Sequence, residues 1–152
     1  MSTYSATVDW TLEGDFAAGR YSRGHSISFD GGITVAGSAS PANVPPPYAV
    51  EAAVDPEELF VASLSTCHML WFLDLARRAG VVIEGYRDAA EGVMARNGQG
   101  RMAMTRVVLR PEVSLSDQAD RGRIAALHHA AHEACFIANS VTTEVVVEPQ
   151  GG

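Results

Sequence analysis

The alternation of apolar and polar residues predicts strands near both ends of the chain. The segment "TYSATVDWTL" at 3–12 is rich in β-branched and aromatic residues, which is typical of a strand. Residues 25–29 predict a short strand followed by a turn at 30–32, and "TTEVVVEP" at 142–149 predicts a last strand. The segment 38–54 contains four prolines and is therefore predicted to be a loop.

A long helix is predicted directly after this loop. Asp55 suits the N-cap, Pro56 the first helical position and Gly80 the C-terminal cap, so the pattern predicts a helix that ends near Ala79. Between Leu59 and Leu73 apolar residues occur on nearly every face. Such a helix is expected to be buried on all sides, in the core or in an oligomer interface.

The second half of the chain predicts a hairpin and a second helix. Residues 81–115 predict two strands joined by a turn at 97–100. Apolar residues at spacings of three and four predict a helix from Asp117 to about Cys135. The whole order predicts an α+β fold with a mostly antiparallel sheet and two core helices, in a single domain over 1–152.

Composition and charge exclude several classes of function. The net charge of −7 indicates neither nucleic acid nor an anionic membrane surface as a partner. The apolar run at 59–73 is shorter than the ~20 residues of a membrane span, and "MSTYSATVDW" shows no signal peptide, so we expect a cytoplasmic protein. All eleven basic residues are arginine, which excludes catalysis by a lysine Schiff base.

The chain has two cysteines, and the first lies inside the apolar helix, in "SLSTCHMLWFL" at 63–73. Cys67 alone is explained as a small buried hydrophobe. Cys135, however, lies on the apolar face of the second helix, so the two thiols could meet across the core. A reactive cysteine also needs a cation and an orienting carboxylate, and the arginines of 20–23 and the acidic pair of 57–58 offer both.

Two motifs carry a family resemblance. "DPEELFVASLSTC" at 55–67, together with "AHEACFIANS" at 131–140, resembles the OsmC/Ohr family of thiol peroxidases. The resemblance implies an OsmC-like α+β fold that forms an intertwined homodimer, with reactive cysteines near the subunit interface. It also implies reduction of organic hydroperoxides and no metal or organic cofactor.

The resemblance assigns roles residue by residue. Cys67 matches the peroxidatic cysteine, Cys135 the resolving cysteine, and Glu57 the carboxylate that orients the family's arginine. That arginine is either Arg23 or Arg20, and we favour Arg23. The implied enzyme is a cysteine-based hydroperoxide reductase, in which a Cys67 sulfenic acid condenses with Cys135 to a disulfide that an external dithiol, of lipoyl type or another small dithiol, reduces.

Three positions depart from the family pattern. Phe136 stands where a proline commonly follows the resolving cysteine, and His68 follows Cys67 where an apolar residue is usual. The glycine-rich stretch before the arginine is reduced to Gly19. These departures suggest a branch whose substrate differs from the best-known ones.

The position of Glu57 raises a geometric problem. Ten residues of straight helix rise ~15 Å, so Glu57 cannot touch Cys67 along an unbroken helix. Arg23, held by Glu57, is expected to bridge the gap. The alternatives are a helix break near 62–63 or a glutamate from the second subunit.

Two rival interpretations remain. Zinc ligands could come from His132 with Cys135, from Cys67 with His68, or from His128 with His132. A partly exposed helix face explains His128, His129 and His132 more simply. The other rival is a non-catalytic OsmC-like dimer that binds a small apolar ligand. His25, close to Arg23, either positions the arginine loop or is a solvated turn residue.

Overall fold

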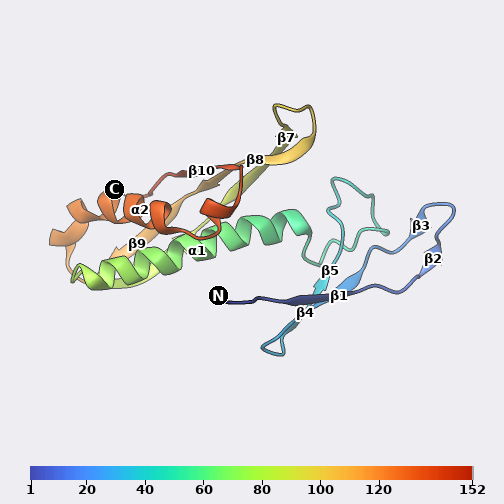
Figure 1. Ribbon diagram of the computed structural model, residues 1–152, viewed down its shortest axis with the longest axis horizontal. Helices are drawn as coiled ribbons and strands as arrows, with labels where there is room; N and C mark the ends of the chain where they lie inside the picture. The colour runs from blue at the N-terminus through green and yellow to red at the C-terminus, as the bar shows by residue number, and fades with distance from the viewer. Residues whose placement is uncertain (152) are drawn as a thin grey trace. The chain divides into compact units, whose positions relative to one another are not determined.

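The computed structural model describes residues 1–151, and these fall into two compact units. Unit 1 comprises Met1–Leu59, and unit 2 begins at Phe60 and continues through the rest of the described chain. Figure 1 gives the elements of both, and each unit is described by itself below.

Unit 1 is built from short antiparallel strands. β1 (Ala6–Asp9), β4 (His25–Phe29) and β5 (Thr34–Gly37) form one sheet in the order β1-β4-β5. β2 (Gly14–Asp15) and β3 (Arg20–Tyr21) form a separate two-stranded ribbon. The predicted strand at 25–29 and its following turn are confirmed, whereas the strand predicted over 3–12 is regular only in β1.

The proline-containing segment 38–54 forms turns, as predicted. Its two ends are held together by Ser38, whose backbone N–H donates to the Val54 carbonyl and whose hydroxyl accepts from the Val50 N–H. Ser38 is 1% exposed, so this hydroxyl satisfies a backbone donor inside the unit.

α1 (Pro56–Arg78) has the ends that the sequence predicts. The Glu58 N–H donates to the Asp55 carboxylate at 2.8 Å, and the Asp55 N–H donates to the Glu58 carboxylate at 3.1 Å, which is a capping box. At the other end Gly80 adopts a φ of +76°, and the Val81 N–H donates to the Ala76 carbonyl. This is a Schellman motif, and its left-handed position favours glycine.

The burial of α1 differs from the prediction. Within the chain only one stripe of the helix is fully buried, formed by Leu64, His68, Phe72 and Ala76 at every fourth position. Leu70 is 58% exposed, so the prediction of burial on all sides is wrong for the single chain. By length and composition the 23-residue helix could cross a membrane, but core helices of soluble proteins pass the same test.

The strands of unit 2 form two sheets. β6 (Ile83–Asp88) pairs antiparallel with β9 (Pro111–Leu115). β7 (Glu91–Arg96) and β8 (Met102–Leu109) form a hairpin, and β10 (Glu144–Val147) adds to β8 in parallel. The hairpin turn predicted at 97–100 is confirmed, but 81–115 contains four strands instead of two.

The second helix begins later than predicted. Residues Gln118–Arg123 form a 3-10 helix, η1, followed by α2 (Ile124–Ala134) and a short 3-10 turn, η2 (Ala138–Ser140). Cys135 caps the C-terminal end of α2 in an extended conformation, with φ −64° and ψ 112°. The predicted helix is therefore confirmed over Ile124–Ala134. The prediction is wrong for residues 118–123, which form a 3-10 helix, and for Cys135, which caps the helix.

The core of unit 2 joins α1 and α2 to the sheet. Figure 1 shows α1 and α2 side by side. One cluster packs buried residues of α1, β9, α2 and the segment after α1, namely Phe72, Ala76, Val81, Val113, Leu115, Ile124 and Ala131. A smaller cluster packs Leu64 of α1 on Val107 and Leu109 of β8. Together these clusters fix the faces of α1 and α2 from which the two cysteines project.

Candidate functional site

The two cysteines meet in unit 2. Both are free thiols, Cys67 partly exposed in the middle of α1 and Cys135 buried at the end of α2. Cys67 is among the groups that raise the pKa of Cys135, so its side chain lies close to that of Cys135. The structure thus brings the two predicted sulfur residues together, although 68 positions separate them in the sequence (135 − 67).

The two thiols differ in environment. Burial raises the pKa of Cys135 to about 11, and the hydrogen bond and the charge of Cys67 act in the same direction. Backbone hydrogen bonds at Ala138 and Ile137 oppose this shift only in part. Cys135 therefore remains protonated near neutral pH, while Cys67 is the thiol with access to solvent.

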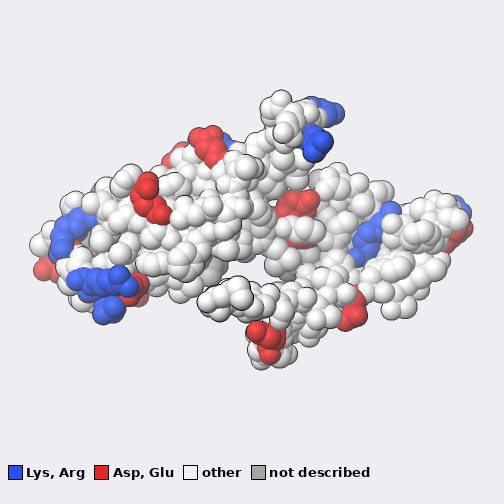
Figure 2. Space-filling view, viewed as in Figure 1, with Lys and Arg blue, Asp and Glu red and all other residues white. Residues whose placement is uncertain are grey.

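Large apolar residues that follow each cysteine in the sequence form an exposed surface. Trp71, one helical turn after Cys67, makes an edge-to-face contact with Phe136 at 5.2 Å between ring centroids. Phe136 is 67% exposed and Leu70 58%. Figure 2 shows the middle of α1 as an uncharged surface, with basic groups at its C-terminal end. A hydrocarbon chain could pack here.

Asp88 anchors α1 close to the first thiol. Its carboxylate accepts a 2.6 Å hydrogen bond from the hydroxyl of Ser65, two residues before Cys67. The other oxygen accepts from the Arg110 N–H, also at 2.6 Å. Asp88 was not a sequence candidate because it lies 23 residues from Ser65 and belongs to no recognisable motif.

Two histidines lie buried beside the thiols in sequence. His68 is 1% exposed and His128 2% exposed, and their rings are hydrogen-bonded at 3.0 Å. The explanation of His128 by an exposed helix face is therefore wrong, since its ring lies in the core between α2 and α1. His129 is exposed, as that explanation required, and His132 is half-buried.

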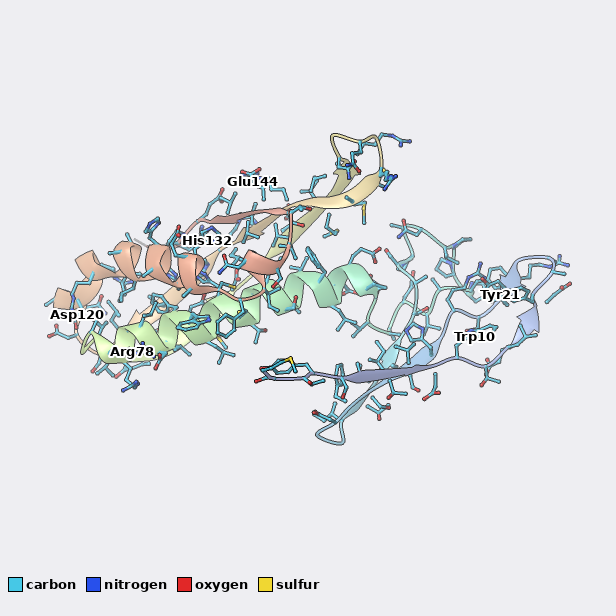
Figure 3. All side chains as sticks on the ribbon, viewed as in Figure 1. Trp10, Tyr21, Arg78, Asp120, His132 and Glu144 are labelled. Carbon is cyan, nitrogen blue, oxygen red and sulfur yellow. The ribbon has the colours of Figure 1, made fainter. Side chains whose placement is uncertain are left out.

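A metal site finds no support in the geometry. Among residues 1–151 no three His, Cys, Asp or Glu side chains converge in a way that could hold a metal ion. His128 and His132 both line a cavity of about 330 Å³ beside β10, together with Val147 and Pro149. Figure 3 shows His132 on α2.

Arg23 lies in unit 1, against an aromatic wall. Its guanidinium carbon is 3.6 Å from the centroid of the Tyr21 ring, a cation–π contact. Nη1 donates to the carbonyl oxygens of Gly19 and Tyr21, at 3.1 and 2.6 Å. These bonds hold one edge of the guanidinium and orient the other.

A pocket of about 380 Å³ surrounds Arg23 within unit 1. Its walls include Trp10, Phe16 and Tyr21, which pack on one another with ring centroids 4.9 to 6.2 Å apart. Trp10 and Tyr21 are labelled in Figure 3. Aromatic walls beside a cation suit an apolar molecule that carries a polar or negative group.

His25 and Gly37 support this pocket. The His25 Nδ1–H donates to the Arg23 carbonyl at 2.8 Å, so this histidine positions the arginine loop. Gly37 pairs with His25 across β4 and β5, and any side chain at position 37 would collide with the His25 ring. Of the two interpretations of His25, the positioning role agrees with these contacts.

Arg20 has a different environment. Its guanidinium lies 3.8 Å from the Asp15 carboxylate, with both side chains more than half exposed. Such a surface pair contributes little to stability. Of the two arginines, only Arg23 lines the aromatic pocket.

Glu57 also lies in unit 1, at the start of α1. Its Oε2 atom is buried and has no hydrogen-bond partner among residues 1–151. Among residues 1–151 no ion pair joins Glu57 to Arg23, whose hydrogen bonds run to backbone carbonyls. α1 continues without interruption from Pro56 to Arg78, so the alternative of a helix break near 62–63 is wrong.

Comparisons with known proteins agree with this fold. The model of the OsmC-like protein family matches residues 49–150. An OsmC-like protein of unknown function from Vibrio cholerae is 48% identical, with a TM-score of 0.95 over 98% of this chain and 99% of that one. Among curated proteins, no sequence matches this chain.

More distant structures share the fold alone. An organic hydroperoxide resistance protein from Legionella pneumophila is 19% identical, with a TM-score of 0.66 over 98% of this chain and 97% of its own. One from Elizabethkingia anophelis is 17% identical, with a TM-score of 0.66 over 97% and 95% of the two chains. The family match and the 48% identical structure show that the chain belongs to the OsmC-like family.

Proposed function

We propose that the protein is a thiol-dependent hydroperoxide reductase that acts on organic hydroperoxides. The observation that carries the proposal is the adjacent pair of free thiols, with Cys67 accessible and Cys135 buried and protonated. A peroxidatic thiol needs access to its substrate, whereas a resolving thiol must wait until a sulfenic acid has formed beside it. Family members named for organic hydroperoxide resistance support the substrate class.

The cycle uses two sulfur steps. The Cys67 thiolate attacks the terminal oxygen of the hydroperoxide, the O–O bond breaks, and the alkoxide leaves as an alcohol after it takes up a proton. Cys67 is now a sulfenic acid. The sulfur of Cys135 then attacks the Cys67 sulfur, and the sulfenic hydroxyl leaves with the thiol proton as water.

The enzyme is restored by an external reductant. A small dithiol, of lipoyl type or similar, exchanges with the Cys67–Cys135 disulfide and becomes a disulfide itself. Arg23 stabilises the Cys67 thiolate and the breaking O–O bond, and Glu57 holds Arg23 during the reaction. The free edge of the guanidinium and the unpartnered Glu57 oxygen are available for these roles.

The active form in this proposal is a homodimer. Unit 1 exposes many large apolar side chains, and unit 2 exposes Leu70 and Phe136 close to the thiols in sequence. A monomer rarely leaves this much apolar surface in water, so a second copy is the natural cover. The exposed apolar residues of unit 1 include Tyr4, Val8, Trp10, Leu12, Phe16 and Ile33.

Thiol titration tests the proposal. Reduced, metal-free protein is treated with one equivalent of an alkyl hydroperoxide, and free thiols are counted before and afterwards. Loss of both thiols within seconds is expected in the wild type. Cys135→Ser should stop at a sulfenic acid that dimedone labels, and Cys67→Ser should keep its single thiol.

The same titration distinguishes the rival function. The aromatic pocket around Arg23 also suits a non-catalytic module that binds a small apolar ligand. Such a module would lose no thiol to the hydroperoxide, and its Cys67→Ser variant would behave as the wild type does. That result would contradict the proposed reductase function.

A further inference from the structure

A buried histidine pair joins the two helices that carry the cysteines. The Nε2 atom of His68 on α1 and the Nδ1 atom of His128 on α2 are 3.0 Å apart. Both residues are almost fully buried, at 1% and 2% exposure. A hydrogen bond in the core between two elements fixes their relative position more strictly than apolar contact does.

The surroundings give the pair a defined orientation. The His128 ring stacks on Phe72 with centroids 4.1 Å apart and planes inclined by 17°. Phe72 lies one turn after His68 on the same face of α1. The His128 ring therefore contacts two successive positions of α1, one by a hydrogen bond and one by stacking, and this double contact resists rotation of α1 against α2.

Each histidine of the pair lies on the same element as one of the thiols or within two helical turns of it in the sequence. His68 directly follows Cys67, and His128 precedes Cys135 by seven residues, which is two helical turns. A rotation of α1 that broke the histidine contact would also turn Cys67 away from Cys135. Because the histidine contact and the cysteine contact both join α1 to α2, a change in the position of the histidines also changes the position of the sulfurs.

The two rings share one proton between the facing nitrogens. One nitrogen must donate and the other accept, so the contact requires at least one neutral ring. The outer nitrogens, Nδ1 of His68 and Nε2 of His128, are buried without a hydrogen-bond partner among residues 1–151. No hydrogen bond therefore holds a second proton on either ring.

Other titratable groups face the pair from two elements. His132 on α2 acts on His68, while Asp88 and Tyr86 lie on β6 beside the two rings. Burial is the main cause that lowers the pKa of each histidine to about 4, and Asp88 opposes it only in part at His68. At neutral pH both rings are neutral and the hydrogen bond is intact.

We propose that His68 and His128 are positioning residues that hold Cys67 and Cys135 in the arrangement from which the disulfide closes. The catalytic meaning of this role rests on the proposed function, in which closure joins the Cys67 sulfenic acid to Cys135 and releases water. The geometric claim is independent of the peroxide: any oxidant that joins these two sulfurs should depend on the pair. The histidines themselves neither gain nor lose electrons.

The decisive variant replaces the hydrogen bond and keeps the ring. His128→Phe retains stacking on Phe72 but cannot bond to His68, and we expect disulfide closure about tenfold slower or worse. His128→Asn is the rescue variant, since its amide can place a polar atom where Nδ1 lies, and it should restore most of the rate. His68→Gln is the equivalent conservative variant on α1.

Two oxidants separate this inference from the proposed function. Closure is followed by stopped flow with an alkyl hydroperoxide and, separately, with diamide, which couples two thiols and is itself reduced to a hydrazine. The exposed His129→Phe variant is the matched control and should stay within about twofold of the wild type. Dimedone labelling of sulfenic acid in the hydroperoxide arm measures the first step alone.

The inference predicts a split between the two steps. In His128→Phe the sulfenic acid should form at the wild-type rate and persist longer, and diamide closure should be slow, with recovery in His128→Asn. Diamide closure at the wild-type rate in His128→Phe would overturn the inference. If the hydroperoxide fails to oxidise the wild type while diamide shows the split, the proposed function fails and the positioning role stands.

Discussion

The two units of the chain differ in how far they bury apolar and titratable side chains. Unit 2 buries two histidines and a cysteine among well-packed clusters from α1, α2 and the strands. Unit 1 has only Ile27 and Ala49 as buried apolar residues, while four of its large aromatic side chains are exposed, those of Tyr4, Trp10, Phe16 and Phe29. Unit 2 has the interior of a folded domain, and unit 1 resembles half of an interface.

This contrast separates two kinds of chemistry. The sulfur pair belongs to the packed unit, where burial raises the pKa of Cys135 and keeps that thiol protonated. The arginine belongs to the open unit, where the guanidinium rests on an aromatic ring beside a pocket. Substitutions in unit 2 should therefore act on stability and sulfur geometry, and those in unit 1 on binding, activation and assembly.

The largest effect is expected in the core of unit 2. Leu64 of α1 is fully buried against β8, so Leu64→Ala should lower the free energy of unfolding by about 2–5 kcal/mol. Urea denaturation followed by circular dichroism measures it. Leu12→Ala in unit 1, where the side chain is 49% exposed, is the matched control, and an equal loss there would contradict the contrast.

Arg23 tests the chemistry of unit 1. Arg23→Met keeps the length of the side chain and removes the cation, so formation of the Cys67 sulfenic acid should slow by about 100-fold. The rate of dimedone labelling under a fixed hydroperoxide concentration measures this. Arg20→Met should change it by no more than about twofold, because Arg20 faces Asp15 on the surface; the reverse order would make Arg20 the activating residue.

The histidine pair predicts acid sensitivity of unit 2. Both histidines have a pKa of about 4 in the folded chain, against the ordinary 6.5, because burial disfavours the charged ring. Between pH 4 and pH 6.5 the unfolded chain binds more protons than the folded chain. The contribution of the two neutral histidines to the free energy of unfolding is therefore fully present above about pH 6.5 and is lost as the pH falls toward 4. Urea midpoints at several pH values measure this loss.

A double variant serves as the control for that experiment. His68→Gln combined with His128→Asn removes both titrating rings and keeps polar side chains at the two positions. Its stability should change less between pH 6.5 and 4.5 than that of the wild type. An unchanged slope would mean that other groups cause the acid sensitivity.

The smallest effect on the folded chain is expected at the exposed aromatic surface of unit 1. Phe16 is 59% exposed, so Phe16→Ser should alter the free energy of unfolding little. If a second copy covers this surface, the dimer should dissociate about tenfold more readily, as sedimentation over a dilution series would show. The exposed Met102→Ser in unit 2 is the control, and a wild-type dimer in Phe16→Ser would place the interface elsewhere.

Local signals made much of the fold predictable. The ends of α1 follow from residues adjacent in sequence, the capping box of Asp55 with Glu58 and the left-handed Gly80. The turn at 97–100 is equally local. The strand boundary at 89–90 was missed because "DAAE" contains neither the glycine nor the proline that usually ends a strand. The boundary at 110 was missed although Pro111 follows it.

The candidate site was predictable only in part. Cys67 and Cys135 could be selected because thiols are few and chemically distinct. The partnership of His68 with His128 spans 60 residues and arises only when α1 packs on α2, so no spacing in the sequence signals it. Asp88 likewise gains its role through tertiary contacts with Ser65 and Arg110.

Peptide mapping by mass spectrometry tests the central claim most directly. Reduced protein is treated with one equivalent of an alkyl hydroperoxide, quenched with a thiol-alkylating reagent, digested without reduction and searched for linked peptides. The account predicts one linked pair within each chain, the Cys67 peptide joined to the Cys135 peptide. Recovery of both peptides alkylated and unlinked would contradict it.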